Sequence, residues 1–416
     1  RSDGALSIFA SSTGSTSSIF SISSAQKSNI LKVFANGKIG IGTSTPAEKL
    51  SVVGSISNIL DTSDTTAITQ LSTTSVGKGP ASIFVSGRYA YVANATSNSI
   101  SIMDISNPSA PVRIATTTLG GSPQAIYVSG RYAYLVDSCC RIMVVDISDP
   151  VNSRQIATTT LANVDSPASI YVSGKYAYFA AQGSGFTVVD ISNPLSPVDV
   201  TTTPLSEGNP LSVYVSGRYA YVGGSDFFTV IDISNPAYPR QTANINLGST
   251  VSSIYVSGRY AYTANADVGS ISVIDISDSA APVQVATTSV GTTPQSIYIS
   301  GRYAYVANFG SNNVSIVDVF NSSVPVQVTT LSVEKGPYSI FVSGRYAYVA
   351  NFTSSTLSVI DISGTEVTSL IAHSAEVGNL QSRNDIFAQG NIMAGTGLNV
   401  GDGCIMSQGS LSVFAS

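Results

Sequence analysis

One carboxylate recurs seven times in this sequence, at the same position of a repeated segment. A set of acidic side chains could bind a metal ion or take part in acid–base catalysis. Each of these residues, however, precedes a turn such as 106–108 (Ser-Asn-Pro), where a carboxylate most simply accepts hydrogen bonds from backbone amides. We therefore predict a structural role for them, and likewise for Arg88 and its counterparts. The seven carboxylates are Asp104, Asp146, Asp190, Asp232, Asp275, Asp318 and Asp361.

No signature of catalysis accompanies these carboxylates. His373 is the only histidine, and the sequence has no Ser-His-Asp pattern, no phosphate-binding glycine loop and no metal-ligand spacing. The sequence therefore predicts no enzyme activity, no cofactor and no metal site.

A loop that varies between otherwise similar repeats is the better candidate for a binding site. Its Asn, Asp and aromatic side chains suit carbohydrate, although drift in unconstrained loops explains the variation equally well. The candidate ligand-binding residues are Asn94, Asp137, Asp226, Asp267, Asn308, Phe309, Asn351 and Phe352.

Two covalent modifications are also candidates. Four sequons of the form N-x-[ST] could carry glycans, although a chain rich in Ser, Thr and Asn yields such sequons by chance. Cys139 and Cys140 are adjacent and Cys404 is distant, so a disulfide between two of the three leaves one thiol free or paired with another chain. Unpaired small residues explain the cysteines as well. The four sequons begin at Asn94, Asn313, Asn321 and Asn351.

The repeat that carries these residues predicts the fold. Its constant glycine, first seen at Gly87 and last at Gly344, returns seven times at spacings of 41 to 44 residues. The first copy contains four strand-like segments, at 82–86, 88–93, 100–105 and 112–118. A repeat of about 40–45 residues with four short strands is the signature of a β-propeller blade.

Ring closure follows from the number of fourth strands. Six copies are followed by one, whereas the seventh copy ends at Ile362 without one. The segment 68–76, upstream of the first copy, aligns with the fourth strand that begins at Pro282. We therefore predict an all-β, seven-bladed propeller with four-stranded blades, in which this N-terminal strand closes the last blade.

The element Val230-Ile-Asp-Ile-Ser-Asn-Pro236 and its weaker copies resemble the LVIVD-repeat propellers of bacterial and archaeal surface proteins. The resemblance covers 68–362 and implies the fold, but it implies little about function, because propellers serve many unrelated activities. The sequence has no Trp, so the WD-repeat family is not the match.

The composition limits the classes of partner. Charged residues are only 10 % of the 416 and the net charge is −5, so no basic patch for nucleic acid is expected. No apolar run is long enough to span a membrane. Loops rich in Ser, Thr, Asn and Gly are typical of secreted adhesive or structural proteins, so we expect an extracellular, cell-surface location.

The flanks of the propeller, predicted at 62–364, have another character. Segments 1–61 and 365–416 are predicted to be β-rich stalks, with strands at 6–9, 17–23 and 29–34. Residues 37–54 resemble the stalk repeats of phage tail fibres and trimeric bacterial surface fibres, although a small β-subdomain that caps the propeller is an alternative. Blade topology predicts that both flanks leave from one face, side by side.

The last eleven residues, 406–416, match the first eleven in seven identities. Either the chain is one link of a longer tandem protein or identical chains join end to end, and both arrangements describe a fibre. We therefore predict a structural subunit of a fibre, a homo-oligomer or polymer. The alternative is an adhesin whose loops bind a glycan or a surface protein. The predicted self-assembly residues are Leu6, Ile8, Phe9, Leu411, Val413 and Phe414.

Overall fold

The computed structural model describes residues 18–22, 31–34, 39–41, 50–52, 68–162, 164–205 and 208–362, and all regular elements among them are strands. Four short strands form a separate sheet in the order β1-β2-β3-β4. Its first two pairs are antiparallel, and β3 and β4 are parallel. The strands predicted at 17–23 and 29–34 are thus confirmed. The bounds are β1 Ser18–Ile22, β2 Leu31–Phe34, β3 Ile39–Ile41 and β4 Leu50–Val52.

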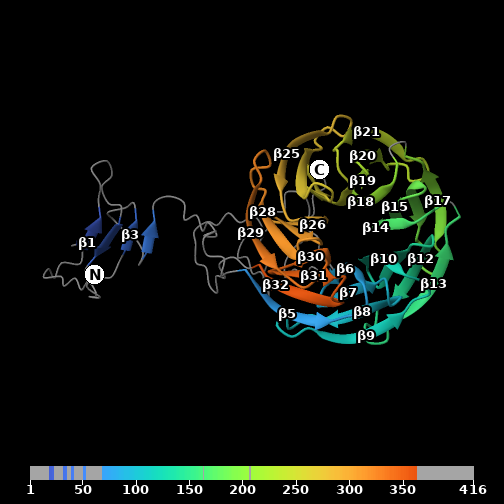
Figure 1. Ribbon diagram of the computed structural model, residues 1–416, viewed down its shortest axis with the longest axis horizontal. Coiled ribbons are helices and arrows are strands. Elements are labelled where there is room, and N and C mark those ends of the chain that lie inside the picture. Colours follow the sequence, from blue (N-terminus) through green and yellow to red (C-terminus); the bar gives the residue numbers. More distant parts are fainter. Residues whose placement is uncertain are drawn as a thin grey trace, which may run out of the picture. The chain divides into compact units, whose positions relative to one another are not determined.

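Residues 68–362 form a closed ring of seven four-stranded antiparallel sheets, here called blades 1 to 7 (Figure 1). In each blade the first strand lies nearest the centre of the ring and the fourth lies at the perimeter. The first strands are β6 Pro80–Ser86, β10 Pro123–Ser129, β14 Pro167–Ser173, β18 Pro210–Ser216, β22 Val251–Ser257, β26 Pro294–Ser300 and β30 Pro337–Ser343. The second strands are β7 Tyr89–Asn94, β11 Tyr132–Asp137, β15 Tyr176–Ala181, β19 Tyr219–Gly224, β23 Tyr260–Asn265, β27 Tyr303–Asn308 and β31 Tyr346–Asn351.

The outer half of each blade completes the sheet. The third strands are β8 Ser99–Asp104, β12 Arg141–Asp146, β16 Gly185–Asp190, β20 Phe227–Asp232, β24 Ser270–Asp275, β28 Asn313–Asp318 and β32 Thr356–Asp361. The fourth strands are β9 Val112–Thr118, β13 Arg154–Thr160, β17 Val198–Thr203, β21 Arg240–Asn246, β25 Val283–Ser289, β29 Val326–Ser332 and, in blade 7, β5 Thr69–Ser75.

The N-terminal strand closes the ring as predicted. Strand β5 pairs antiparallel with β32, and the register places Thr69 opposite Asp361 and Ser75 opposite Thr356. The first and last residues of the ring therefore lie side by side, as blade topology predicts. Blade 7 therefore joins the two ends of the ring by an antiparallel ladder, with one register shift between Val359 and Ile360.

Both faces of the middle strands are buried, which explains why the sequence shows little alternation of polar and apolar residues. In β7, for example, five successive residues from Ala90 to Asn94 are buried. Each hydrophobic cluster is filled from two adjacent blades, such as the cluster that joins Tyr91 and Ile100 of blade 1 to Ile126 and Leu135 of blade 2. A sheet that lies between two neighbouring sheets has no solvent-facing side in its centre.

Serine side chains link the innermost strands of neighbouring blades. In six of the seven interfaces between blades, a serine hydroxyl of the first strand accepts a hydrogen bond from a backbone amide in the first strand of the next blade. An example is the bond from Ile126 N to Ser82 Oγ (3.2 Å). Blade 2 has Ala125 at this position, opposite Ile170 of blade 3. The other five acceptors are Ser169, Ser212, Ser253, Ser296 and Ser339.

The substitution Ala125→Ser is expected to stabilise the ring. It supplies the acceptor that the other six interfaces have, and one such hydrogen bond contributes about 1 kcal/mol. Thermal unfolding should show a higher Tm for Ala125→Ser and no gain for the matched control Ala125→Val, which adds volume without an acceptor. An unchanged or lower Tm for the serine variant would contradict this interpretation of the interface.

Candidate functional site

The antiparallel blades give the ring two faces of different composition. The hairpin face carries the tight hairpins between first and second strands, such as Ser86–Tyr89, and the turns between third and fourth strands, such as 105–111. The loop face carries the second-to-third loops, such as 95–98, and the fourth-to-first loops, such as 119–122. All candidate ligand residues named above belong to the loop face or to the strand ends below it.

The recurring carboxylates lie on the hairpin face and have the structural role predicted for them. Asp104 pairs with Arg88, and its Oδ1 accepts a hydrogen bond from Ser106 N (2.9 Å). The Arg88 guanidinium also lies 5.4 Å from the ring centre of Tyr89, in cation–π geometry. This arrangement recurs with small changes around the ring; blade 3 has Lys175 instead of arginine, 3.9 Å from Asp190.

These ion pairs predict a loss of stability in acid. Hydrogen bonds from Arg88 and Ser106 lower the pKa of Asp104 to about 2, and the pKa of Asp146 and that of Asp275 are also lowered to about 2. A carboxyl whose pKa is lowered in the folded state stabilises the fold above about pH 4, which is the pKa of the same group in the unfolded chain. This stability is lost as the pH falls toward 2. These pairs should therefore cause no loss of Tm from pH 7 to about 4 and a fall in Tm below it. A Tm unchanged down to pH 2 would contradict the assignment.

Four of the eight candidate ligand residues are buried. Asn94 is 0 % exposed and donates from Nδ2 to Ser101 Oγ (3.0 Å). Asn308 and Asn351 are equally buried and bond the third strand of their own blades in the same way. These amides tie the second strand to the third and cannot contact a ligand outside the folded ring. This corrects the sequence interpretation for Asn94, Asn308, Asn351 and Asp137.

Burial also decides between the sequons. A glycan on Nδ2 requires an accessible amide, so the buried Asn94 and Asn351 are not acceptors in the folded chain. Asn313 is half-buried, and Asn321 is exposed on the hairpin face. Of the four predicted sequons, Asn321 is the one whose asparagine is exposed.

Blade 2 replaces the buried asparagine with an ion pair. Asp137 is 0 % exposed, and its carboxylate accepts hydrogen bonds from Arg141 N (2.9 Å), Arg141 Nε (2.7 Å) and Cys139 N (3.0 Å). Arg141 also donates to Gly120 O (2.9 Å), so that it anchors the fourth-to-first loop. Cys139 and Cys140 lie in the second-to-third loop of blade 2 and form no disulfide with another described residue; Cys404 lies outside the described residues.

Two candidate ligand residues are exposed in the second-to-third loops of blades 4 and 5. Asp267 is exposed, and its Oδ2 accepts a hydrogen bond from Thr250 N (2.8 Å). Asp226 is exposed with a φ of 67°. The two residues lie in loops of different blades. Among the described residues, no three His, Cys, Asp or Glu side chains are grouped so that they could hold a metal ion.

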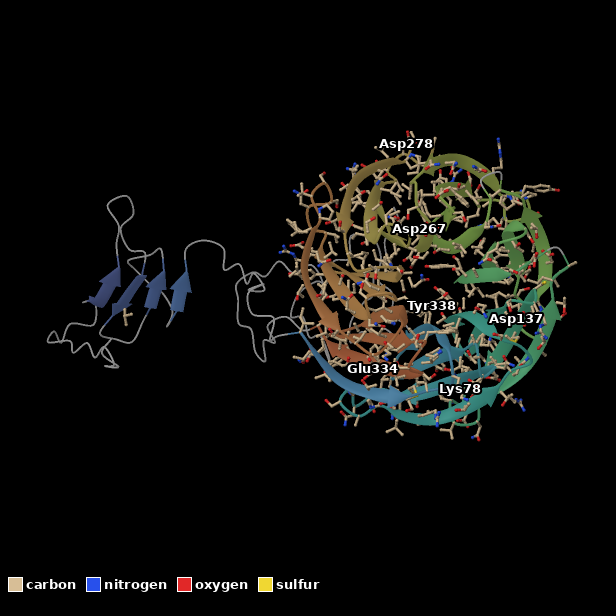
Figure 2. All side chains as sticks on the ribbon, in the orientation of Figure 1. Lys78, Asp137, Asp267, Asp278, Glu334 and Tyr338 are labelled. Atoms are coloured by element: carbon tan, nitrogen blue, oxygen red, sulfur yellow. The ribbon has the colours of Figure 1, made fainter. Side chains whose placement is uncertain are left out.

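The remaining two candidates, Phe309 and Phe352, belong to one aromatic cluster on the loop face. Tyr338, at the start of β30, lies between them: its ring centre is 6.0 Å from that of Phe309 and 5.5 Å from that of Phe352. All three side chains are half-buried. Figure 2 places Tyr338 toward the centre of the ring. We define these three residues as the aromatic cluster.

Sequence reasoning missed Tyr338, although a signal was present. The position after the first residue of the inner strand is aromatic only in blade 7. The same comparison between copies would have singled it out. The equivalent residues of blades 1 to 6 are Ala81, Gln124, Ala168, Leu211, Ser252 and Gln295.

A second aromatic array lines the centre of the ring and was also missed. Each first strand contributes one Phe or Tyr, and each ring contacts the next at a centroid distance of 4.7 to 5.1 Å, so that the seven form a closed circle. Burial raises the pKa of Tyr127, Tyr214 and Tyr298 well above the usual value. The seven residues are Phe84, Tyr127, Tyr171, Tyr214, Tyr255, Tyr298 and Phe341.

One carboxylate oxygen of blade 3 is buried without a hydrogen-bond partner. This atom is Asp199 Oδ1, and burial raises the pKa of this carboxyl. Five of the other fourth strands have glutamine here, and in three of them it donates to the threonine three residues later: from Gln70 to Thr73 Oγ1 (2.5 Å), from Gln284 to Thr287 Oγ1 (2.6 Å) and from Gln155 to Thr158 Oγ1.

The substitution Asp199→Gln is expected to raise the free energy of unfolding by about 1 kcal/mol at pH 7, because it removes a poorly solvated charge and lets an amide reach Thr202. A carboxyl with a raised pKa destabilises the folded state only while it is charged, so the gain in free energy of unfolding should be smaller at pH 3.5 than at pH 7. Denaturant unfolding at both pH values measures this gain. An equal gain at both values would contradict the electrostatic cause.

Seven blades of four antiparallel strands, closed by an N-terminal strand, make this chain a seven-bladed β-propeller. It belongs to the LVIVD repeat family, whose repeat matches more than half of the chain, at residues 79–117, 120–153, 166–202, 207–246, 248–289, 291–332 and 338–370. No curated protein matches the sequence.

Solved structures with the same fold are distant in sequence. Hydrazine synthase of Kuenenia stuttgartiensis is similar with a TM-score of 0.58 and 20 % identity, covering 69 % of this chain and 97 % of that one. The Cps50 (Swd1) propeller of Myceliophteria thermophila is similar with a TM-score of 0.59 and 10 % identity, covering 71 % of this chain and 100 % of that one. A putative 6-phosphogluconolactonase of Bacteroides fragilis is similar with a TM-score of 0.53 and 14 % identity, covering 62 % of this chain and 85 % of that one. At these identities the likeness concerns the fold alone.

Within the described part of the chain, no helix has the length and hydrophobicity needed to cross a membrane.

Proposed function

We propose that this chain is a non-enzymatic structural subunit of an extracellular surface fibre, which displays its propeller as a side bead. The observation that carries the proposal is the pairing of Thr69 with Asp361, because the ring begins and ends at one point of the hairpin face. A domain whose two ends are adjacent can be inserted into a continuous shaft without interrupting it.

Exposed apolar side chains support the hairpin face as the side that faces the shaft. Among the described residues, ten of the eleven large hydrophobic residues that are at least 36 % exposed belong to the third-to-fourth turns or to the first three residues of fourth strands, and Val268 is the exception. These residues are spread over blades 1 to 6, and their concentration on one face favours contact of that face with another surface. We assign it to contact with the flanking segments of the chain. The ten are Val112, Val151, Leu195, Val198, Tyr238, Val283, Val285, Phe320, Val324 and Val326.

The proposed contact between copies uses the two matching ends of the chain. Residues 1–11 and 406–416 share seven identities, so the tail of one copy has the sequence to take the place of the next copy's head. A head-to-tail contact that does not close generates an open filament. The predicted self-assembly residues, from Leu6 to Phe9 and from Leu411 to Phe414, lie outside the described residues.

Negative-stain electron microscopy of the purified full chain tests this proposal. We expect filaments with regularly spaced beads, and we expect Leu411→Asp with Phe414→Asp to leave single particles. The matched control is Val268→Asp, which places the same charge on the loop face and should leave the filaments intact. Single particles for the unsubstituted chain, or filaments for the double variant, would overturn the proposal.

The second candidate function is a cell-surface adhesin whose loops bind a ligand. The aromatic cluster of blades 6 and 7 favours it, and a fibre that displays such a propeller would serve both functions. A neutral polar surface suits an extracellular location, since Ser, Thr, Asn and Gly predominate in the loops.

A further inference from the structure

The loop face is chemically uneven, because aromatic residues follow the second strand only in blades 6 and 7. Phe309 and Phe352 occupy this position there, and Tyr338 lies between them. Since the frame of the blade is the same in all copies, the fold does not require the two phenylalanines. The equivalent residues in blades 1 to 5 are Ala95, Ser138, Gln182, Ser225 and Ala266.

Backbone hydrogen bonds fix the loops that carry the aromatic cluster. Phe352 N donates to Gly336 O (2.7 Å), and Gly336 N donates to Asn312 Oδ1 (2.8 Å), so the loops of blades 6 and 7 are joined. Gly336 has a φ of 69°, and a Cβ there would lie 3.0 Å from Phe309 Cε2. The glycine thus allows close packing of the phenylalanine edge, and the site is organised before any ligand arrives.

Neutral hydrogen-bonding groups belong to the same loops and to the loops next to them. Thr292, Ser311 and Asn312 of blade 6 and Thr353 and Ser354 of blade 7 supply hydroxyl and amide groups. Ser311 Oγ lies 3.0 Å from Thr292 Oγ1, and Ser354 lies beside the Lys335 carbonyl. The two charged residues of the adjacent loop, Glu334 and Lys335, have opposite signs. The site therefore combines apolar ring faces with uncharged donors and acceptors.

We propose that the aromatic cluster is the binding site for a neutral oligosaccharide. A pyranose ring presents an apolar C–H face, which stacks on an aromatic ring, and a rim of hydroxyls, which require neutral hydrogen-bond partners. The three rings, with centres 6.0 and 5.5 Å apart and planes inclined to one another, form one compact aromatic surface on which a sugar face can stack. A protein partner is less suited, because three half-buried rings offer far less than the ~800 Å² per partner of a stable interface.

The site does not depend on fibre formation, and its test uses variants that keep the fold of the blade. Phe309→Ala and Phe352→Ala reproduce the alanines of blades 1 and 5, and Tyr338→Gln reproduces the glutamine of blades 2 and 6. The matched control is Phe320→Ser on the hairpin face, where an aromatic side chain that is 78 % exposed is replaced by the serine that the other six repeats have at the equivalent position.

The full chain is applied to a printed array of neutral and acidic glycans, and the best-bound glycan is titrated calorimetrically. We expect binding to a neutral oligosaccharide, with Kd raised at least tenfold by each cluster variant and unchanged by Phe320→Ser. No glycan binding, preference for acidic glycans, or binding that survives all three cluster variants would overturn the proposal. Filaments of the Phe309→Ala variant, viewed in parallel, separate this result from the fibre hypothesis: they should form normally.

Discussion

Replacement of Arg141 by serine is expected to lower the free energy of unfolding by about 3–5 kcal/mol. Arg141 supplies the positive charge and two of the hydrogen bonds that compensate Asp137, which is 0 % exposed. Without the guanidinium, a buried carboxylate has no counter-charge, and such a group costs several kcal/mol. Guanidinium-chloride unfolding of the full chain, followed by circular dichroism, measures the loss.

The double variant Asp137→Asn with Arg141→Ser serves as the control. It recreates the pair found in blade 1, where Asn94 donates from Nδ2 to Ser99 Oγ (3.3 Å). Because an amide and a hydroxyl carry no charge, most of the lost stability should return. If the double variant is as unstable as Arg141→Ser alone, the uncompensated charge is not the cause of the loss.

The second large effect is expected at the central circle of aromatic rings. Tyr214 contacts Tyr171 at a centroid distance of 4.9 Å and Tyr255 at 5.1 Å. Tyr214→Ala removes both contacts and leaves a gap in a closed array, so we expect a loss of about 3 kcal/mol. Tyr214→Phe keeps the ring and should cost less than about 1 kcal/mol, as Phe84 and Phe341 occupy the same position in blades 1 and 7.

The tyrosines of this circle also predict sensitivity to alkali. Burial raises the pKa of Tyr214 and of Tyr298, and the stability that such a group contributes is lost as the pH rises above about 10. Equal stability of Tyr214→Ala and Tyr214→Phe at pH 7 would contradict the packing role. A Tm that stays constant to pH 12 would contradict the burial of the phenols.

The repeat made the propeller predictable from the sequence. Seven copies of a four-strand pattern give the blades, and the missing fourth strand after Ile362 points to 68–76 as the closing strand, which the pairing of β5 with β32 confirms. Comparison between copies also predicted the structural role of the carboxylates: an aspartate that occupies the position of Asp104 in every blade belongs to the common structure of the repeat.

Comparison between the repeats could not predict which of the candidate ligand residues are accessible to solvent. Asn94 and Asp226 are both polar residues close to the end of a second strand, yet one is fully buried and the other exposed. The difference depends on the loop that arrives from the neighbouring blade: a Cβ at Gly77 would lie 2.5 Å from Asn94. Such contacts join residues that are distant along the chain, and local patterns do not contain them.

The aromatic cluster shows the same limit. Phe309 and Phe352 were identified because they vary from the frame, but their connection through Tyr338 crosses from one blade to the next. Only the closed ring brings the start of β30 beside the loops that follow β27 and β31. The site is therefore a property of two blades together and not of either repeat alone.

The central claim, that terminal segments join copies while the propeller is displayed, is tested most directly by helical reconstruction of filaments grown from the full chain. We predict that residues 1–11 and 406–416 of successive copies meet in the shaft and that Phe309, Tyr338 and Phe352 face solvent. Copies that touch through their loop faces, with both ends of the chain free of contact, would contradict the account.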